Sequence, residues 1–501
     1  MLLFFLAFFA LYWLSASRLR WQNMLLLVGS YAFYALTDWH MCLLLLAATA
    51  AFYGLGLLVQ YHLARDDGKE GLCTTLGVVL GVAVLFYFKY LDFCIESVAA
   101  LLNHMGLSCQ PATLHILMPV GVSFFTFKLI SYLLEIHRQR IDATRDFVAF
   151  AGYVAFFPTL MSGPIDRPNK FLPQLQQPRR FDYGLAFEGC RQTLWGLVKK
   201  KLVADNLAPV VAAVWQSVST TDAAIGDYWM ALLLYPVQMY MDFSGYSDMA
   251  IGVSKLLGFR VAVNFRYPFQ ARNVAEYWRR WHISLTGWLT DYVFTPLSLS
   301  FRRWGNCGIC LAIVINMVLV GLWHGANWTF AVFGLYHGLL FVPLIFSGVF
   351  TRHAKQQTGR LGLPPFPDAL RMAGTYLLVA LGLVIFRASS VTQAMHFISH
   401  TLGFSSSAHV AMSLFALPLT PRLDSRLILA VVLAIAIFLL EWRCRLQEFP
   451  QPLYNAYRRL SLSHGHSAAL LRFLLLLSYA LVIIIILLFC GTDAQFIYFA
   501  F

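Results

Sequence analysis

His324 could do chemistry in a part of the chain that is otherwise suited to lipid. It lies in the stretch GLWHGANW, with Trp323 before it and Asn327 three positions after it. The surrounding run of 48 residues, from Trp304 to Thr351, contains no Asp, Glu, Lys or Arg. An ionisable group in such a run is costly and commonly faces a cavity, so His324 is a candidate functional residue. A histidine that only hydrogen-bonds a neighbouring helix fits the spacing equally well.

A second histidine, His282, lies in the block NVAEYWRRWHISLTGWL, where charged and aromatic residues stand together. If residues 274–282 form one helix, Trp278 and His282 share a face, and so do Glu276 and Arg280. The same pattern is typical of an amphipathic helix at the membrane surface with arginine anchors. Composition alone favours the anchor, and the block is also compatible with a site.

The charges beside the two histidines predict their depth. Arg279 and Arg280 indicate that the block around His282 lies close to the cytoplasmic surface. His282 is therefore expected on the inner side and His324 further out. Two histidines at different depths suggest a polar path across the protein.

The composition indicates that a membrane must position these residues. The chain has 501 residues, of which 59% are hydrophobic and 12% charged, and its mean hydropathy is positive. One globular core could not bury so much apolar surface, whereas a spanning helix needs roughly 20 apolar residues. Apolar runs recur at about 1–17, 21–36, 41–63, 74–101, 113–135, 147–162, 228–241, 307–323, 328–350, 371–386, 425–442 and 468–490. They predict about ten to twelve spans or re-entrant helices in a single polytopic domain over residues 1–501.

The run around His324 is predicted to form a helical hairpin or a pair of re-entrant helices. Arg302 and Arg303 precede the run, and Arg352 and Lys355 follow it, so the orientation rule places both ends in the cytoplasm. The turn falls at the letters GAN, directly after His324. This histidine is therefore expected deep in the membrane or towards its outer face.

The net charge of +13 is interpreted as an orientation signal, because the basic residues gather in a few loops. The first segment, MLLFFLAFFALYWLSAS, lacks basic residues before its apolar run and is followed by Arg18 and Arg20. It is predicted to be an uncleaved helix with its amino end outside. No soluble segment combines basic and aromatic residues, which argues against nucleic-acid binding. The nine scattered cysteines, the CGIC stretch included, do not predict a metal site.

Four stretches together resemble the membrane-bound O-acyltransferase family: FFPTLMSGPIDR, QMYMDFSGYSDMAIGVSKLLGF, NFRYPFQARNVAEYWRRWHISLTGWL and GLWHGANWTFAVFGLYHG. The resemblance is to the bacterial branch that contains the alginate O-acetyltransferase membrane subunit. It is strong over about 110–350, the predicted catalytic core, and the hydropathy extends it to both ends. The stretches are long and correctly ordered, so the match is specific.

The resemblance implies an all-α polytopic membrane enzyme with about ten to twelve transmembrane or re-entrant helices around a central tunnel. The catalytic histidine of the family's WHG motif corresponds to His324, and the histidine of WRRWHISL corresponds to His282. The resemblance further implies acetyl-CoA as a cytoplasmic acyl donor, with no bound cofactor. The acetyl group would reach an exopolysaccharide outside the cell inner membrane.

Imidazole chemistry suits such a role. An ordinary imidazole pKa of about 6.5 lies close to working pH, so His324 could remove a proton from an attacking hydroxyl. Attack by His324 itself, giving an acetyl-imidazole, is the alternative. Asn327 could hydrogen-bond the thioester oxygen or orient the imidazole, with Trp323 as a supporting neighbour.

Basic residues near the cytoplasmic surface are candidate contacts for the phosphates of CoA. Arg279 and Arg280 can form charge-assisted hydrogen bonds with such groups. The run Lys199–Lys201 is a further candidate, although a membrane anchor is the preferred interpretation of three adjacent lysines.

The carboxyl-terminal tail, 491–501, carries the letters FIYFAF and is expected outside, because no basic residue follows Arg472. It resembles a terminal aromatic motif of this bacterial branch and of small partner peptides of D-alanyl transfer, in which a tyrosine is a proposed acyl carrier. Tyr498 is therefore a possible acyl carrier. On composition alone the end of an aromatic belt is the preferred interpretation of the tail.

Three functional interpretations follow. The first is an acetyltransferase for an extracellular polysaccharide such as alginate or cellulose, working with a periplasmic SGNH esterase-like acetyltransferase in a polysaccharide biosynthesis complex. The second is an enzyme with the same acyl-transfer chemistry but another acceptor or donor, for peptidoglycan acetylation or for D-alanyl transfer. The third is a carbohydrate or lipid transporter, which would not consume acetyl-CoA.

Overall fold

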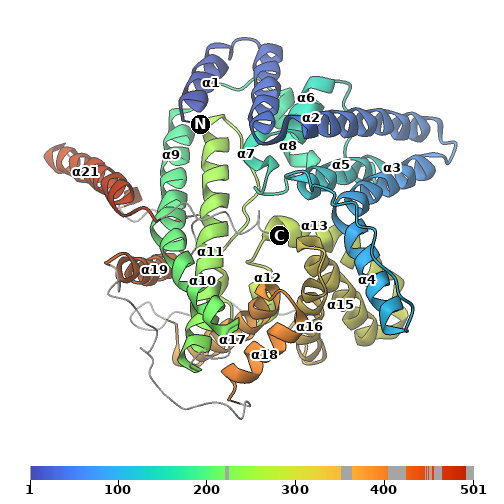
Figure 1. The fold of residues 1–501 in the computed structure, drawn as a ribbon. Coiled ribbons are helices and arrows are strands. Elements are labelled where there is room, and N and C mark those ends of the chain that lie inside the picture. Colours follow the sequence, from blue (N-terminus) through green and yellow to red (C-terminus); the bar gives the residue numbers. More distant parts are fainter. Residues whose placement is uncertain are drawn as a thin grey trace. The chain divides into compact units, whose positions relative to one another are not determined.

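The structure, a computed structural model, is helical wherever regular elements are described. It describes residues 2–219, 225–350, 364–403, 425–445, 447, 449–450, 454–455 and 465–491. Every regular element in these ranges is an α-, π- or 3₁₀-helix, as Figure 1 illustrates. The prediction of an all-α protein is confirmed for this part of the chain.

The chain divides into two compact units. The first consists of Met1–Thr193 with Ala250–Ala262, and the second of Leu194–Met249 with Val263–Phe501. The helices that begin in the first unit are α1 (Leu2–Leu14), α2 (Leu19–Arg65), α3 (Glu70–Leu85), η1 (Phe86–Tyr90), α4 (Leu91–His104), α5 (Val122–His137), α6 (Phe147–Val154), α7 (Phe157–Leu160), α8 (Pro168–Gln176) and α9 (Tyr183–Leu197).

The second unit contains the histidine candidates. Its helices are η2 (Val198–Ala204), α10 (Asp205–Ser219), most of α11 (Ile225–Leu256), η3 (Pro268–Gln270), α12 (Val274–Trp278), α13 (Ile283–Leu289), η4 (Thr290–Phe294), α14 (Thr295–Ser300), η5 (Arg302–Trp304), α15 (Gly305–His324), α16 (Trp328–Phe346), α17 (Phe366–Arg387), α18 (Val391–Thr401), α19 (Ser425–Arg443) and α21 (Gly465–Phe489).

Five helical segments of the described chain are long and apolar enough to cross a membrane. They are Trp39–Arg65, Glu70–His104, Arg302–His324, Trp328–Phe346 and Phe366–Arg387. Shorter apolar helices lie at Phe5–Leu14 and Phe473–Phe489. These helices are those of a polytopic membrane protein, and the number of ten to twelve spans stays a prediction.

Two of the apolar runs, 21–36 and 41–63, belong to one helix. Helix α2 continues for 47 residues through the letters ALTDWHM, which contain neither proline nor glycine. A single Asp does not stop a helix, because only proline removes a backbone donor and clashes with the preceding turn. The polar residues between two apolar runs therefore do not by themselves indicate a turn.

Helices α15 and α16 form the hairpin that was predicted around His324, and they lie side by side in Figure 1. Small residues allow their backbones to approach closely. A Cβ atom at Gly321 would lie 2.0 Å from the carbonyl oxygen of Phe330, and one at Gly334 would lie 2.3 Å from that of Met317. Glycine is therefore required at both positions for the two helices to pack.

Candidate active site

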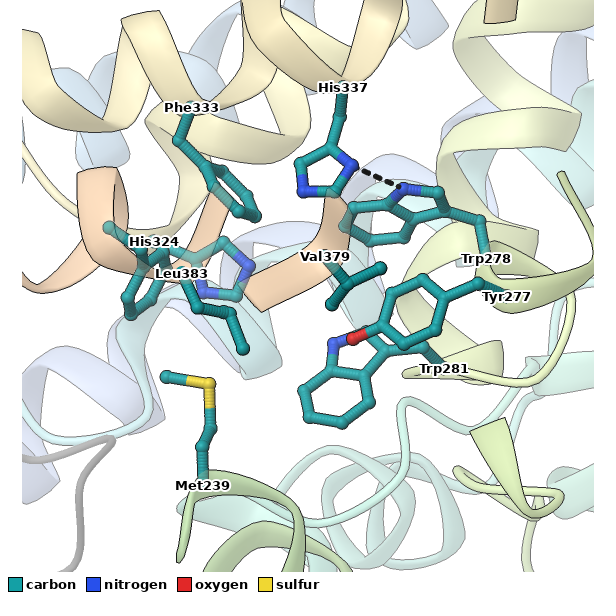
Figure 2. A pocket seen from close by; sticks show the side chains of 10 residues that line it. Met239, Tyr277, Trp278, Trp281, His324, Phe333, His337, Val379 and Leu383 are labelled. Carbon is teal, nitrogen blue, oxygen red and sulfur yellow. Dashed lines mark hydrogen bonds between the residues drawn. The ribbon is translucent and has the colours of Figure 1, made fainter. Parts of the chain in front are cut away.

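A pocket in the second unit is lined by two histidines and eight aromatic or apolar side chains (Figure 2). The lining residues are Met239, Tyr277, Trp278, Trp281, His324, Phe333, His337, Val379, Leu383 and Phe386. They come from α11, from α12 and the turn after it, from the α15–α16 hairpin, and from α17. Such an apolar pocket with a few polar groups is the usual form of a small-molecule site.

Helical spacing explains why these side chains converge. Phe333 and His337 are four residues apart on α16, and Val379, Leu383 and Phe386 follow one another at four and three residues on α17. Residues at these spacings lie on one face of a helix. Each of the two helices therefore presents one stripe of side chains to the pocket.

His324 is the last residue of α15, and the local sequence fixes this position. Gly325 has an extended backbone, and a Cβ atom there would lie 2.1 Å from the ring of Phe330. The His324 side chain is 8% exposed, and its ring packs edge-to-face against Phe386 with centroids 5.1 Å apart. The predicted hairpin turn at GAN is thus confirmed, and it places His324 in the pocket wall.

His337 is a pocket histidine that the sequence analysis missed. It lies in the same charge-free run as His324, thirteen residues further on, within the letters GLYHG. Its Nδ1 accepts a hydrogen bond of 3.3 Å from the indole Nε1 of Trp278. The rule that marks His324, an ionisable group in an apolar run, would have identified His337 as well.

His282 lies behind the pocket wall and is not one of the residues that line it. Its ring and that of His324 both pack edge-to-face against the indole of Trp323, with centroids 5.7 and 5.1 Å from it. His282 is fully buried, and its Nδ1 lies 3.2 Å from Oδ1 of Asn264. Trp323 therefore provides an aromatic contact between the two histidines, and the polar path stays a prediction.

The expectation of one helix over residues 274–282 is wrong. Helix α12 ends at Trp278, and His282 has a left-handed backbone with φ of 44° directly before α13. Asn264 explains the break, because its Oδ1 also accepts a hydrogen bond of 2.6 Å from the Ser284 hydroxyl and its carbonyl accepts one from the backbone N–H of Ile283. Trp278 consequently faces the pocket, while His282 turns away from it.

Burial makes the charge of His282 depend on folding. Burial lowers the pKa of His282 to about 3, so its imidazole is neutral in the folded protein at ordinary pH. The unfolded chain takes up this proton below about pH 6.5, so it binds more protons than the folded chain between about pH 6.5 and 3. The free energy of unfolding should therefore decrease as the pH is lowered through this range, by up to about 1.4 kcal/mol per pH unit.

We expect His282→Gln to make the free energy of unfolding less dependent on pH between 7 and 4. Denaturant unfolding followed by tryptophan fluorescence measures it. The exposed His104 supplies the control, since His104→Gln should keep the dependence of the wild type. An unchanged slope in His282→Gln would contradict the assignment.

The arginines after α12 have different surroundings. Arg280 donates a hydrogen bond of 2.7 Å to Oε1 of Glu276, which confirms the expected pair, and another to the carbonyl oxygen of Arg266. Arg279 is exposed and contacts the carbonyl oxygen of Phe350 at 3.4 Å. Arg279 can therefore reach an external anion, whereas Arg280 is held by Glu276.

Asn327 acts as a helix cap in the structure. Its Oδ1 accepts a hydrogen bond of 2.9 Å from the backbone N–H of Thr329, at the start of α16. Its Nδ2 donates one of 3.2 Å to the carbonyl oxygen of Ser389. Both ends of the amide thus fix the hairpin turn that follows His324, and Asn327 does not line the pocket.

The interpretation of the three adjacent lysines as a membrane anchor is wrong, and so is a role as phosphate contacts. Lys199 lies 2.9 Å from Asp248 and 3.6 Å from Glu441. The other ion pairs of η2 join Lys200 to Asp205 at 2.8 Å, Lys200 to Asp242 at 2.6 Å, and Lys201 to Asp205 at 3.0 Å. These lysines therefore form an internal ion-pair network.

Two points concern the tail tyrosine and the cysteines of the sequence analysis. Tyr498 lies outside the described residues, so its role as an acyl carrier stays a prediction. Among the side chains that the structure describes, no three His, Cys, Asp or Glu residues are grouped so that they could hold a metal ion. Cys307 and Cys310 of the CGIC stretch are free thiols on α15.

The apolar helices and the buried histidine pocket together define a multi-pass membrane protein with an internal site. The sequence profile of the membrane-bound O-acyltransferase family matches residues 27–364. The chain therefore belongs to this family and is an O-acyltransferase. The resemblance found in the sequence is confirmed, and the transporter interpretation is set aside.

Three relatives indicate the range of acyl transfer in the family. The chain is 37% identical to a probable alginate O-acetylase AlgI of Azotobacter vinelandii, over 91% of this chain and 85% of that protein. It is 28% identical to a peptidoglycan O-acetyltransferase of Helicobacter pylori, over 81% and 79% of the two chains. It is also 28% identical to a teichoic acid D-alanyltransferase of Streptococcus thermophilus, over 53% and 68%.

Proposed function

We propose that the protein takes acetyl groups from cytoplasmic acetyl-CoA and delivers them across the cell inner membrane for O-acetylation of an extracellular polysaccharide of the alginate or cellulose type. The observation that carries this proposal is the 37% identity, over nearly the whole chain, to a probable alginate O-acetylase. The pocket supports it, because its aromatic and aliphatic lining suits the methyl group of an acetyl thioester.

In this reaction His324 acts as the general base. It removes the proton from the acceptor hydroxyl, and the hydroxyl oxygen attacks the carbonyl carbon of the thioester. The carbon–sulfur bond then breaks, the acetyl group becomes an ester of the acceptor, and the proton passes from His324 to the CoA thiolate. Atoms and charge balance without any further reactant.

The donor's phosphates would bind at the cytoplasmic side near Arg279. Its guanidinium is exposed and follows directly after Trp278, which lines the pocket. Phosphate oxygens form strong charge-assisted hydrogen bonds with guanidinium groups. This arrangement would direct the thioester end of CoA towards His324.

The acceptor side of the proposal includes a partner. A periplasmic esterase-like transferase with a serine nucleophile would receive the acetyl group within a polysaccharide biosynthesis complex. Both termini would be extracytoplasmic, and the tail that carries Tyr498 could then take the acetyl group on its phenolic oxygen before transfer to the partner.

The pocket favours acetyl over D-alanyl transfer. A D-alanyl group carries an ammonium ion, and a buried ammonium requires a charged or strongly polar partner. None of the ten residues that line the pocket is Asp or Glu. Acetylation of peptidoglycan, the activity in the name of the Helicobacter pylori relative, uses the same donor chemistry and remains the second candidate.

Membrane vesicles can test the donor and its side of entry together. Labelled acetyl-CoA is added to inverted inner-membrane vesicles and, as the control, to right-side-out vesicles, because CoA does not cross the bilayer. We expect release of CoA thiol and transfer of label in the inverted vesicles alone. Peptide mass spectrometry of the wild type and of Tyr498→Phe then locates any label on the tail.

The outcomes separate the parts of the proposal. Label on the terminal peptide of the wild type, absent in Tyr498→Phe, supports the carrier. Full transfer by Tyr498→Phe eliminates the carrier and leaves the acetyltransferase intact. If the inverted vesicles consume no acetyl-CoA, the donor assignment fails.

A further inference from the structure

The second pocket histidine, His337, has a chemical environment that differs from that of His324. It lies in the middle of α16 and is 1% exposed. Figure 2 shows its ring between Trp278 on one side and Phe333 on the other, with one ring nitrogen bonded to Trp278. The second nitrogen points away from Trp278.

The bond from Trp278 determines which nitrogen of His337 carries the proton. An indole N–H can only donate a hydrogen bond, so Nδ1 of His337 must accept it with a lone pair. The imidazole is therefore neutral, and its single proton lies on Nε2. His337 consequently offers an N–H donor at Nε2, whereas a general base must offer a lone pair.

This donor has no hydrogen-bond partner among the residues that the structure describes. The Nε2 atom of His337 is buried, and no described side chain or backbone group accepts from it. Buried polar groups are almost always hydrogen-bonded, so an unpaired one in a ligand pocket indicates a place for a ligand atom. The matching ligand atom is an acceptor, and in an acyl thioester that is the carbonyl oxygen.

Gly382 on α17 lies directly against this donor, where a side chain would not fit. A Cβ atom at this position would lie 2.5 Å from Nε2 of His337 and 3.2 Å from its Cδ2. The neighbours on the same stripe, Val379 and Leu383, carry full side chains into the pocket. Glycine is unfavourable within a helix, and at this position it allows the imidazole of His337 to approach the α17 backbone closely.

We propose that Nε2–H of His337 binds the carbonyl oxygen of the acyl group and stabilises the negative charge that this oxygen gains during transfer. The inference rests on the proposed function, because it requires acyl transfer in this pocket. As the acceptor hydroxyl loses its proton to His324 and attacks, the carbonyl electron pair moves onto the oxygen that His337 holds. The electron pair on this oxygen then re-forms the carbonyl double bond as the carbon–sulfur bond breaks. The departing thiolate takes the proton from His324.

Electrostatics favours His337 as the donor to the carbonyl oxygen and His324 as the general base. A buried donor that the protein already holds in position stabilises developing charge with little reorganisation. In this step Trp278 is a positioning residue, because its indole N–H fixes the tautomer of His337. Removing one such donor from an oxyanion site typically lowers kcat by about 10² to 10³-fold.

The test compares His337→Leu with His337→Gln in the full-length purified protein, with labelled acetyl-CoA as the substrate. Leucine removes both ring nitrogens at similar volume, whereas the glutamine amide restores an N–H donor near the position of Nε2. We expect His337→Leu to lower kcat by about 10² to 10³-fold with KM for acetyl-CoA changed less than about threefold. His337→Gln should recover at least about tenfold of that loss.

A pair of glycine substitutions on α17 provides a second test that leaves His337 in place. Gly382→Ala places a methyl group against Nε2 and should lower kcat about as much as His337→Leu. Gly374→Ala is the matched control on the same helix, since a Cβ atom there meets nothing within 4 Å, and it should keep full activity. Gel filtration and melting temperatures verify that all four variants are folded.

The outcomes distinguish this inference from the proposed function. If the wild type transfers acetyl groups and folded His337→Leu keeps kcat within about threefold, His337 is not the carbonyl donor and the acetyltransferase stands. If His337→Leu and His337→Gln lose kcat equally, a packing role replaces the proposed one. If the wild type itself does not use acetyl-CoA, the proposed function and this inference both fail.

Discussion

Replacing His324 by alanine is expected to lower kcat for acyl transfer by about 10² to 10⁴-fold, because a general base contributes a factor of this size. His324 lines the pocket at the end of α15, so its imidazole is available to an acceptor that enters there. The loss should appear in kcat and in kcat/KM to the same extent, since the proton is transferred only in the transition state.

The fold should survive this substitution. His324 is the last residue of α15, and the close approach of α15 to α16 rests on glycines such as Gly321 and Gly334. His396→Ala is the control, because His396 is an exposed histidine of α18 in the same unit and is not among the pocket residues. It should keep activity within about twofold of the wild type. A folded His324→Ala protein with nearly full kcat would contradict a role as the base.

Local signals explain why the hairpin and His324 could be predicted from the sequence. The charge-free run, the glycine after His324 and the Asn327 cap all lie within a few residues of the turn that they create. Helix ends depend on such neighbours, so the sequence is informative there. The helix end at Trp278 could not be predicted in this way, because Asn264 interrupts the helix from another segment.

The rest of the site depends on contacts between distant parts of the chain. Trp278 fixes the tautomer of His337 from 59 residues away, and Gly382 on a third helix allows the imidazole to pack closely. No periodicity or motif connects these three positions. The sequence therefore predicted one histidine of the pocket correctly and could not indicate how the other is oriented.

The run Lys199–Lys201 was also misinterpreted because its contacts come from distant parts of the chain. Here the sequence suggested an exposed anchor, and the structure shows internal ion pairs. Three adjacent basic residues resemble an anchor, because their partners are far away in the sequence. Asp242 and Asp248 lie on α11 and Glu441 on α19. Only the fold brings these carboxylates to η2, where they turn a basic run into a buried network.

Replacing Lys200 by methionine is expected to lower the free energy of unfolding by about 3 to 5 kcal/mol, as when one partner of a buried ion pair is removed. The carboxylates of Asp205 and Asp242, with side chains 0% and 2% exposed, both contact its ammonium group. Counted in ionised form, the network has three lysines and four carboxylates, so the substitution raises its excess negative charge from one to two. Methionine keeps most of the side-chain volume, so the loss reports on charge more than on packing.

Two controls separate this effect from a general loss of charge. Lys69→Met removes an exposed lysine and should change the free energy of unfolding by less than about 0.5 kcal/mol. Adding Asp242→Leu to Lys200→Met removes a stranded carboxylate and should recover part of the stability. Denaturant titration in detergent measures all three variants. A loss below about 1 kcal/mol in Lys200→Met would mean that the network is solvated and contributes little.

The two substitutions should affect different properties of the protein. His324→Ala should abolish most of the transfer while the melting temperature stays close to that of the wild type. Lys200→Met should lower the melting temperature, yet kcat per folded molecule should stay near the wild-type value at a temperature below unfolding, because Lys200 does not line the pocket. A large fall in kcat of folded Lys200→Met would show instead that the ion-pair network is coupled to the histidine site.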